Sequence, residues 1–246
     1  MMSRRSLSWG AIAVVGVLST VGSASAQTSA AVIFDAEVPA IRFAAGDVQA
    51  ALRARGVAVQ TAAPDRLASQ SAAIQIVITT IDTSLAGQPS VGGLTSQGYA
   101  VRKVTAGTSS RWWAIGADAA GAMYGGLELA EAIQIAGSLS GVGDRQVNPR
   151  LLRRGIKFNI PLDARTPSYS DDSTSAQANI PEMWSMDFWT EFLDDCARHR
   201  YNLLSLWSLS PFPSLVRVPE YPNVALADVK RKSGPLWDAT LQGRRM

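Results

Sequence analysis

Residues 151–213 constrain the fold more than any other stretch, because they read as a strand, a long polar loop, a helix and a second strand. Apolar and polar side chains alternate over residues 156–160 (IKFNI), and this period of two predicts a strand. Pro161 ends the strand because proline has no N–H to donate to a neighbouring strand. Residues 161–181 are too polar and too interrupted for regular structure, so we expect a loop.

A helix and a buried strand follow this loop. Ser185 is placed to cap a helix that begins near Asp187, whose carboxylate suits the positive end of the helix dipole. Apolar side chains recur on one face of this helix at helical spacing, which predicts packing against a sheet. Residues 203–209 form a nearly continuous apolar run, typical of a parallel strand covered on both faces. The whole stretch therefore predicts a βαβ unit, whose ligand-facing edge is the carboxyl end of its strands.

The first 26 residues have the features of a secretory signal peptide. Arg4 and Arg5 precede an apolar stretch over residues 11–21, and Ala24-Ser25-Ala26 fits a cleavage site before Gln27. The apolar stretch is shorter than the ~20 residues needed to cross a bilayer, so we expect no stable membrane insertion after cleavage. The sequence thus predicts a secreted or periplasmic protein.

Charge and cysteine content exclude several classes of protein. Without residues 1–26 the chain has 21 basic and 20 acidic residues, which is not the charge of a nucleic-acid-binding protein. The single cysteine, Cys196, excludes a disulfide framework, and its position on the apolar helix face favours a packing role over a catalytic thiol. One histidine and one cysteine do not provide a typical zinc site, and we expect neither metal nor cofactor.

Residues 27–148 predict a compact α/β domain, with a boundary at Pro149 before the segment 149–246. Strands are expected over residues 31–34, 57–61, 73–81, 99–104 and 111–116, the last two antiparallel. Helices are expected over residues 45–55 and 119–136, with Gly56 ending the first and Asp118 capping the second. Residues 137–148 read as a Gly-rich linker. No repeat is visible.

The glycines between residues 116 and 126 raise the question of nucleotide binding. They lie between a strand and a helix, but their spacing is not G-x-G-x-x-G. Gly125-Gly126 falls inside the helix, where close packing against the sheet explains small residues. We therefore favour packing over a nucleotide site.

Three short motifs together resemble the start of secreted β-N-acetylhexosaminidases (glycoside hydrolase family 20) and of the related α-glucuronidases (family 67). A D-x-x-G-x-x-Y-G helix start is matched by Asp118, Gly121, Tyr124 and Gly125. The R-G-apolar opening of the first barrel strand is matched by Arg154-Gly155-Ile156, and the Y-N-x-L second strand by residues 201–204. The resemblance implies a small α/β domain followed by a catalytic (β/α)8 barrel, and so a glycosidase.

The resemblance also implies a role for Arg154, and the departures from it bear on which sugar the enzyme would act on. It implies that Arg154 hydrogen-bonds substrate hydroxyls or a uronic carboxylate, whereas an arginine here could equally pair with an acid at the barrel rim. Asn159 stands where those enzymes commonly have an aspartate. On the second strand those enzymes have a histidine followed by an acidic pair, and this chain has Trp207-Ser208-Leu209-Ser210-Pro211 there instead. These departures point to a divergent branch that acts on another sugar.

Residues just beyond the carboxyl end of each strand are further candidates for substrate binding. After the first strand these are Asp163, Arg165 and Tyr169, and after the second they are Trp207 and Ser208. Trp207, like Trp184, could stack on a sugar ring or simply pack in the core. The substrate-binding prediction is therefore Arg154, Asp163, Arg165 and Trp207, with a carbohydrate as the partner.

The catalytic residues themselves are not identified. Glycoside cleavage needs two carboxyl groups flanking the bond, and Asp163, Asp171 and Asp172 do not form such a pair. A (β/α)8 barrel takes ~250 residues, so we expect an N-terminal fragment of a longer enzyme that lacks its catalytic acids. His199, near a helix end, is expected to be solvated. The alternative is a non-catalytic carbohydrate-binding or scaffold protein.

Overall fold

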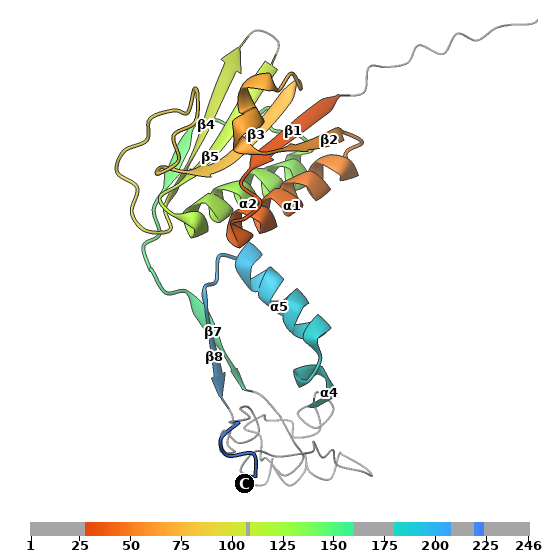
Figure 1. Ribbon diagram of the computed structural model, residues 1–246, viewed down its shortest axis with the longest axis vertical. Coiled ribbons are helices and arrows are strands. Elements are labelled where there is room, and N and C mark those ends of the chain that lie inside the picture. Colours follow the sequence, from red (N-terminus) through yellow and green to blue (C-terminus); the bar gives the residue numbers. More distant parts are fainter. Residues whose placement is uncertain (1–27, 107–108, 160–179, 208–218, 224–246) are drawn as a thin grey trace, which may run out of the picture.

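The computed structural model describes residues 28–106, 109–159, 180–207 and 219–223, which form two units (Figure 1). The N-terminal unit contains β1 (Ser29–Phe34), α1 (Pro39–Ala54), β2 (Ala58–Ala62), the 3-10 helix η1 (Pro64–Ser69), β3 (Ile74–Thr80), β4 (Tyr99–Ala106), β5 (Ser109–Gly116), α2 (Ala119–Ala136) and β6 (Arg145–Val147). The C-terminal unit contains β7 (Gly155–Asn159), α4 (Ile180–Met183), α5 (Met186–Arg198) and β8 (Leu203–Trp207). The expected α/β fold is confirmed.

The N-terminal unit is a six-stranded mixed sheet in the order β2-β1-β3-β5-β4-β6. Strands β1, β2, β3 and β5 are parallel, and β4 pairs antiparallel with both β5 and β6. The antiparallel hairpin of β4 and β5 is as predicted. Strand β6 corrects the prediction of a linker over residues 137–148, because its residues extend the edge of the sheet beside β4.

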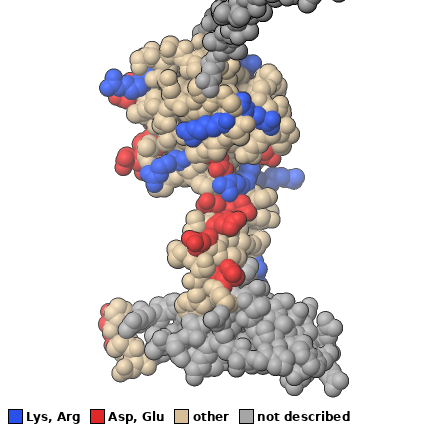
Figure 2. All heavy atoms as spheres, turned by 90° about the vertical axis from the view of Figure 1, so that its right-hand side faces the viewer, with Lys and Arg blue, Asp and Glu red and all other residues tan. Residues whose placement is uncertain are grey.

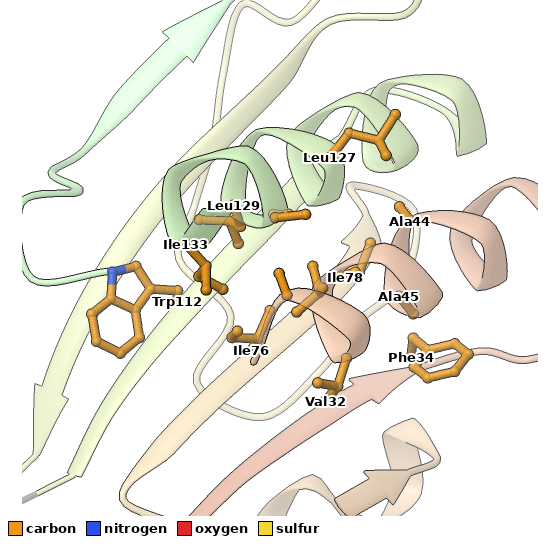
Figure 3. Packing of buried hydrophobic residues seen from close by; sticks show 14 of the residues in the cluster. Val32, Phe34, Ala44, Ala45, Ile76, Ile78, Trp112, Leu127, Leu129 and Ile133 are labelled. Atoms are coloured by element: carbon orange, nitrogen blue, oxygen red, sulfur yellow. The ribbon is translucent and has the colours of Figure 1, made fainter. Parts of the chain in front are cut away.

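Helices α1 and α2 cover one face of this sheet and enclose the main core (Figures 1 and 3). Ile76 and Ile78 project from β3 toward the two helices, and Val32 projects from β1 toward α1 (Figure 3). The opposite face buries a second cluster around Ile33, Val77, Trp113 and Ile115, covered by Leu67 of η1 and by the loop side chains Leu85 and Val91. Burial on both faces explains the continuous apolar run of β1, in which every residue from Ala30 to Phe34 is buried.

The capping residues predicted from the sequence are confirmed at two helix ends, whereas the start of α1 differs from the prediction. Asp118 caps α2 by accepting a hydrogen bond from the Gly121 N–H, and Gly56 has the positive φ of a helix-ending glycine after α1. Helix α1 begins at Pro39, earlier than the predicted residue 45, because Pro39 occupies its first turn with a preset φ.

The glycines inside α2 allow close packing of this helix, as the sequence predicts. A Cβ on Gly126 would lie 2.9 Å from both the Ala44 Cβ and the Ile78 Cδ1.

The C-terminal unit is the predicted strand, helix, parallel strand arrangement. β7 and β8 pair in parallel from Gly155 opposite Leu203 to Asn159 opposite Trp207. Ser185 caps α5, its Oγ accepting from the Phe188 N–H at 3.3 Å. Figure 2, which faces the α1 and α5 side, shows acidic side chains along the narrow part of the molecule below the N-terminal unit. The polar face of α5 thus points to solvent, as its sequence pattern indicates.

None of the described helices is long and apolar enough to cross a membrane. The predicted signal peptide, residues 1–26, lies outside the described residues.

Candidate functional site at the joint between the two units

The three motifs that carry the family resemblance meet in one cluster between the two units. We call this cluster the joint, and it consists of Gln97, Asp118, Tyr124, Arg154 and Asn202. Gln97 precedes β4, Asp118 and Tyr124 belong to the start of α2, Arg154 precedes β7, and Asn202 precedes β8. The hydrogen bonds below connect all of these segments.

Arg154 lies with its guanidinium against the N-terminal unit. Its Nε donates to the Arg200 carbonyl at 2.8 Å, its Nη1 to the Leu151 carbonyl at 2.6 Å and its Nη2 to the Gln97 Oε1 at 2.9 Å. The guanidinium carbon is 5.3 Å from the centroid of the Tyr124 ring, which is a cation–π contact. Three of the five donors of Arg154 are therefore used by neutral protein acceptors.

Gln97 is the residue through which both units are linked. Its Oε1 accepts from Arg154 and also from the Asn202 Nδ2 at 2.8 Å, while its Nε2 donates to the Leu152 carbonyl at 3.0 Å. Its backbone has a φ of 63°, a left-handed conformation that is uncommon outside glycine. This conformation is held by the Gln97 N–H, which donates to the Asp118 Oδ2 at 2.8 Å.

Asp118 anchors Gln97 to the start of α2. It accepts from the Gly121 N–H and the Gln97 N–H, both at 2.8 Å, and from the Ser96 hydroxyl at 3.0 Å. Burial alone would raise the pKa of this carboxyl, but the hydrogen bonds from Gly121, Gln97 and Ser96 outweigh it and lower the pKa below its ordinary value. Asp118 is therefore a charged structural acceptor and not a proton donor at neutral pH.

Asn202 and Arg154 hold the starts of β7 and β8 together. The Arg154 N–H donates to the Asn202 Oδ1 and the Asn202 N–H donates to the Arg154 carbonyl, both at 2.8 Å. Gly155 fits this close approach, because a Cβ on it would lie 2.2 Å from the Leu203 carbonyl oxygen. The Arg-Gly and Tyr-Asn motifs are thus explained by the geometry of the joint.

A second contact between the units lies at the end of α5. Arg198 makes a two-pronged ion pair with Asp47 of α1, with Nε–Oδ2 at 2.8 Å and Nη2–Oδ1 at 3.2 Å. Its guanidinium also lies 5.3 Å from the Phe43 ring centroid. The next arginine in this turn, Arg200, pairs with Glu131 of α2 at 3.3 Å.

Of the four predicted substrate-binding residues the structure describes two, Arg154 and Trp207, and these lie at opposite ends of the β7–β8 pair. Arg154 precedes β7, so it lies at the amino end of the strand pair, whereas ligands of a parallel barrel bind at the carboxyl ends. This geometry favours a role in the joint, and a substrate contact by Arg154 stays a prediction. Trp207 does end β8, beside Asn159 of β7. Asp163 and Arg165 lie outside the described residues, as do Tyr169, Asp171, Asp172 and Ser208.

The remaining candidates show no arrangement for catalysis among the described residues. His199 is exposed, and its Nδ1 lies 2.8 Å from the Asp195 carbonyl at the end of α5. Burial, and then the charge of Asp195, raises the pKa of the Cys196 thiol, which disfavours a nucleophilic thiolate. Trp184 is half exposed beside α4. No group of three potential metal ligands occurs in the part of the chain that the structure describes.

A pocket of about 340 Å³ opens beside the joint. Its polar lining is provided by Gln97 and three arginines, Arg150, Arg154 and Arg200. Its apolar lining is provided by Tyr99, Tyr124, Val147, Pro149 and Leu151. Burial, and then a hydrogen bond from its hydroxyl to Glu128, raises the pKa of Tyr99, so its phenol stays neutral.

The fold is shared with a solved carbohydrate-active enzyme. The structure of a GH138 enzyme targeting pectin rhamnogalacturonan II matches with a TM-score of 0.55 and 19% sequence identity, over 79% of this chain and 26% of that chain. This chain has a glycoside-hydrolase-like fold. It spans about a quarter of the length of that structure, and the match does not single out family 20 or family 67. No protein-family model and no curated protein matches the chain.

Proposed function

We propose that this chain is part of an exported glycoside hydrolase that cleaves O-glycosidic bonds in a polysaccharide or oligosaccharide. The observation that carries the proposal is the joint itself, in which the three hydrolase-like motifs meet within a fold shared with a glycoside hydrolase. In this proposal β7, α5 and β8 are the first elements of a (β/α)8 barrel. The joint then fixes where that barrel sits on the N-terminal unit.

The surfaces of the C-terminal unit support a larger barrel. Leu203 and Leu206 of β8 are 50% and 43% exposed, and Leu193 of α5 is 47% exposed. Strands of a barrel pair on both sides and are covered by helices, whereas the described β7 and β8 pair only with each other. We propose that further βα units cover these surfaces and supply the two catalytic carboxyl groups. The segment described here would then hold substrate but lack the acids that cleave it.

The proposed substrates follow from the resemblance and from the structural neighbour. The neighbour is an enzyme targeting pectin rhamnogalacturonan II, and the sequence motifs resemble enzymes that act on amino sugars and glucuronosides. We therefore propose acidic plant polysaccharide fragments as the first substrates to test, with amino-sugar oligomers as the second. A hexosaminidase specificity is less favoured because of the departures at Asn159 and Trp207-Ser208.

The proposal is tested by expressing the complete reading frame that encodes this chain, and the 246-residue chain alone, with sugar release measured by chromatography on both substrate classes. We expect release by the complete protein and none by the 246-residue chain. If the complete protein binds these sugars but releases none, the non-catalytic carbohydrate-binding alternative replaces the hydrolase. For export, we expect N-terminal sequencing of the secreted or periplasmic protein to begin at Gln27.

A further inference from the structure

The pocket beside the joint carries more positive charge than its protein surroundings neutralise. Arg150, Arg154 and Arg200 line it, and no acidic residue is among its described lining. Within the described residues only Arg200 has a carboxylate partner, Glu131. The acceptors of Arg154 are two carbonyls and an amide oxygen, all neutral.

Arg150 differs from the other two arginines because its guanidinium makes no hydrogen bond or ion pair with the part of the chain that the structure describes. It is an exposed residue of the pocket lining, whereas Arg154 is partly buried. A partly buried charge without a counter-charge is costly, and an incoming anion would reduce that cost. Guanidinium groups also suit carboxylates particularly well, because their planar donors match both oxygens.

The size and the walls of the pocket select among anions. Its volume of about 340 Å³ lies within the range of roughly 300–1,000 Å³ that is usual for small-molecule sites. A small inorganic anion would leave the apolar wall of Tyr99, Val147, Pro149 and Leu151 unused. A ring with an apolar C–H face and one carboxylate uses both parts of the lining.

We propose that this pocket is a binding site for a carboxylate-bearing sugar unit, a uronic acid, with Arg150 as the residue that draws the carboxylate in. Arg154 and Arg200 supply further positive charge, and the two donors of Arg154 that no described residue accepts are available to the ligand. The choice of a sugar acid among organic carboxylates rests on the proposed function. Binding itself requires no hydrolysis, so it can be measured on the 246-residue chain.

The test is isothermal titration calorimetry of the 246-residue chain with three probes: galacturonic acid, galactose and inorganic phosphate. We expect galacturonic acid to bind at least about tenfold more tightly than either galactose or phosphate. We also expect roughly 0.5 M NaCl to weaken its binding, because salt screens a charge interaction at an exposed site. Equal affinity for galactose would overturn the proposal, since charge would then play no part. Equal affinity for phosphate would overturn it because the apolar wall would play none.

The variant Arg150→Gln tests whether binding depends on the arginine in the pocket or only on the overall positive charge of the protein. Arg150 has no described partner to lose, so we expect unchanged folding by circular dichroism and at least about a tenfold loss of affinity for galacturonic acid. The matched control is Arg66→Gln, which removes the same charge from an exposed arginine of η1 whose described ion pair is with Asp65. We expect the control to bind as the unmodified chain does. Equal affinities in the two variants would overturn the proposal.

This result is independent of the hydrolase test. Galacturonic acid binding without sugar release by the complete protein would leave the pocket in place and remove the proposed activity. Sugar release by the complete protein, with no binding by a 246-residue chain that circular dichroism and cooperative urea unfolding show to be folded, would remove the pocket and leave the proposed activity in place.

Discussion

The two units of this protein use the same parallel strand and helix chemistry, but they bury their apolar surface to very different extents. In the N-terminal unit both faces of the sheet are covered, and Trp113, Ile33 and Ile76 are fully buried. In the C-terminal unit no side chain of α5 is buried among the described residues. The comparison indicates that the N-terminal unit holds its own core, whereas the C-terminal unit depends on what packs against it.

The joint connects these unequal units by polar contacts. It links Gln97 and Asp118 of the N-terminal unit to Arg154 and Asn202 of the C-terminal unit through hydrogen bonds with defined directions. Hydrogen bonds of this kind add little net stability each but cost much when one partner is left unsatisfied. The joint is therefore suited to fixing the orientation of the C-terminal unit more than to stabilising it.

The largest effect should come from removing a leucine from the closed core. Leu129 of α2 is fully buried, whereas Leu193 of α5 is 47% exposed. We expect Leu129→Ala to lower the free energy of unfolding by about 2–5 kcal/mol, because it leaves a cavity. The matched Leu193→Ala change should cost about 1 kcal/mol or less, since less apolar area is lost. Urea unfolding followed by circular dichroism measures both. Equal costs would contradict the contrast between the units.

The next effect concerns the link between the units. Gln97→Ala leaves the Arg154 Nη2 and the Asn202 amide without their shared acceptor, and we expect a cost of about 0.5–1.5 kcal/mol, because Asn202 is exposed and water can take the place of that acceptor. Hydrogen exchange should show faster exchange in β7 and β8 while β1 and β3 keep their protection. Gln49→Ala, which removes a hydrogen bond from α1 to the Thr61 hydroxyl of β2 within the N-terminal unit, is the control and should change neither pair. Faster exchange in all four strands would mean that Gln97 supports the core and not the joint.

Local sequence signals predicted much of the N-terminal unit correctly. The α2 bounds follow from the Asp118 cap and the glycine at its end, and the β4–β5 hairpin follows from two alternating runs around a short turn. Strand β6 could not be found in this way, because three residues after a Gly-rich segment carry no periodicity. Its pairing with β4 is decided by tertiary contact. The early start of α1 at Pro39 could have been found from the preference of proline for the first helical turn.

The candidate site was harder to predict, because its central residue carries no motif. Gln97 lies in a polar loop, and its role depends on a left-handed backbone and on partners 21 to 105 positions away in the sequence. The motifs around Asp118, Arg154 and Asn202 were recognised, but a motif does not reveal whether its residues face substrate or another unit. That distinction required the positions of Arg154 and Trp207 at opposite ends of the β7–β8 pair.

Acid should weaken the anchor of Gln97. Because the folded-state pKa of Asp118 lies below its unfolded value of about 3.9, its contribution to stability is present above that pH and is lost as pH falls through the folded pKa. We expect Asp118→Asn to lose less stability than the unmodified protein between about pH 5 and pH 2, measured by urea midpoints. Ser96→Ala, which removes one donor to Asp118, should act in the same direction more weakly. Identical pH profiles would show that Asp118 does not contribute as a charged acceptor.

The smallest effect should come from the ion pair between Arg198 and Asp47, in which opposite charges from the two units meet in a two-pronged geometry. Arg198 is 41% exposed at its side chain, so solvent screens the pair and we expect a coupling energy of about 1 kcal/mol or less. A double-mutant cycle with Asp47→Asn and Arg198→Gln isolates this energy, and it should shrink in roughly 1 M NaCl. The exposed pair of Arg66 and Asp65, at 3.7 Å, is the control and should show no coupling. A coupling of zero for Asp47 and Arg198 would leave the hydrogen bonds around Gln97 and the ion pair of Arg200 with Glu131 to orient the C-terminal unit.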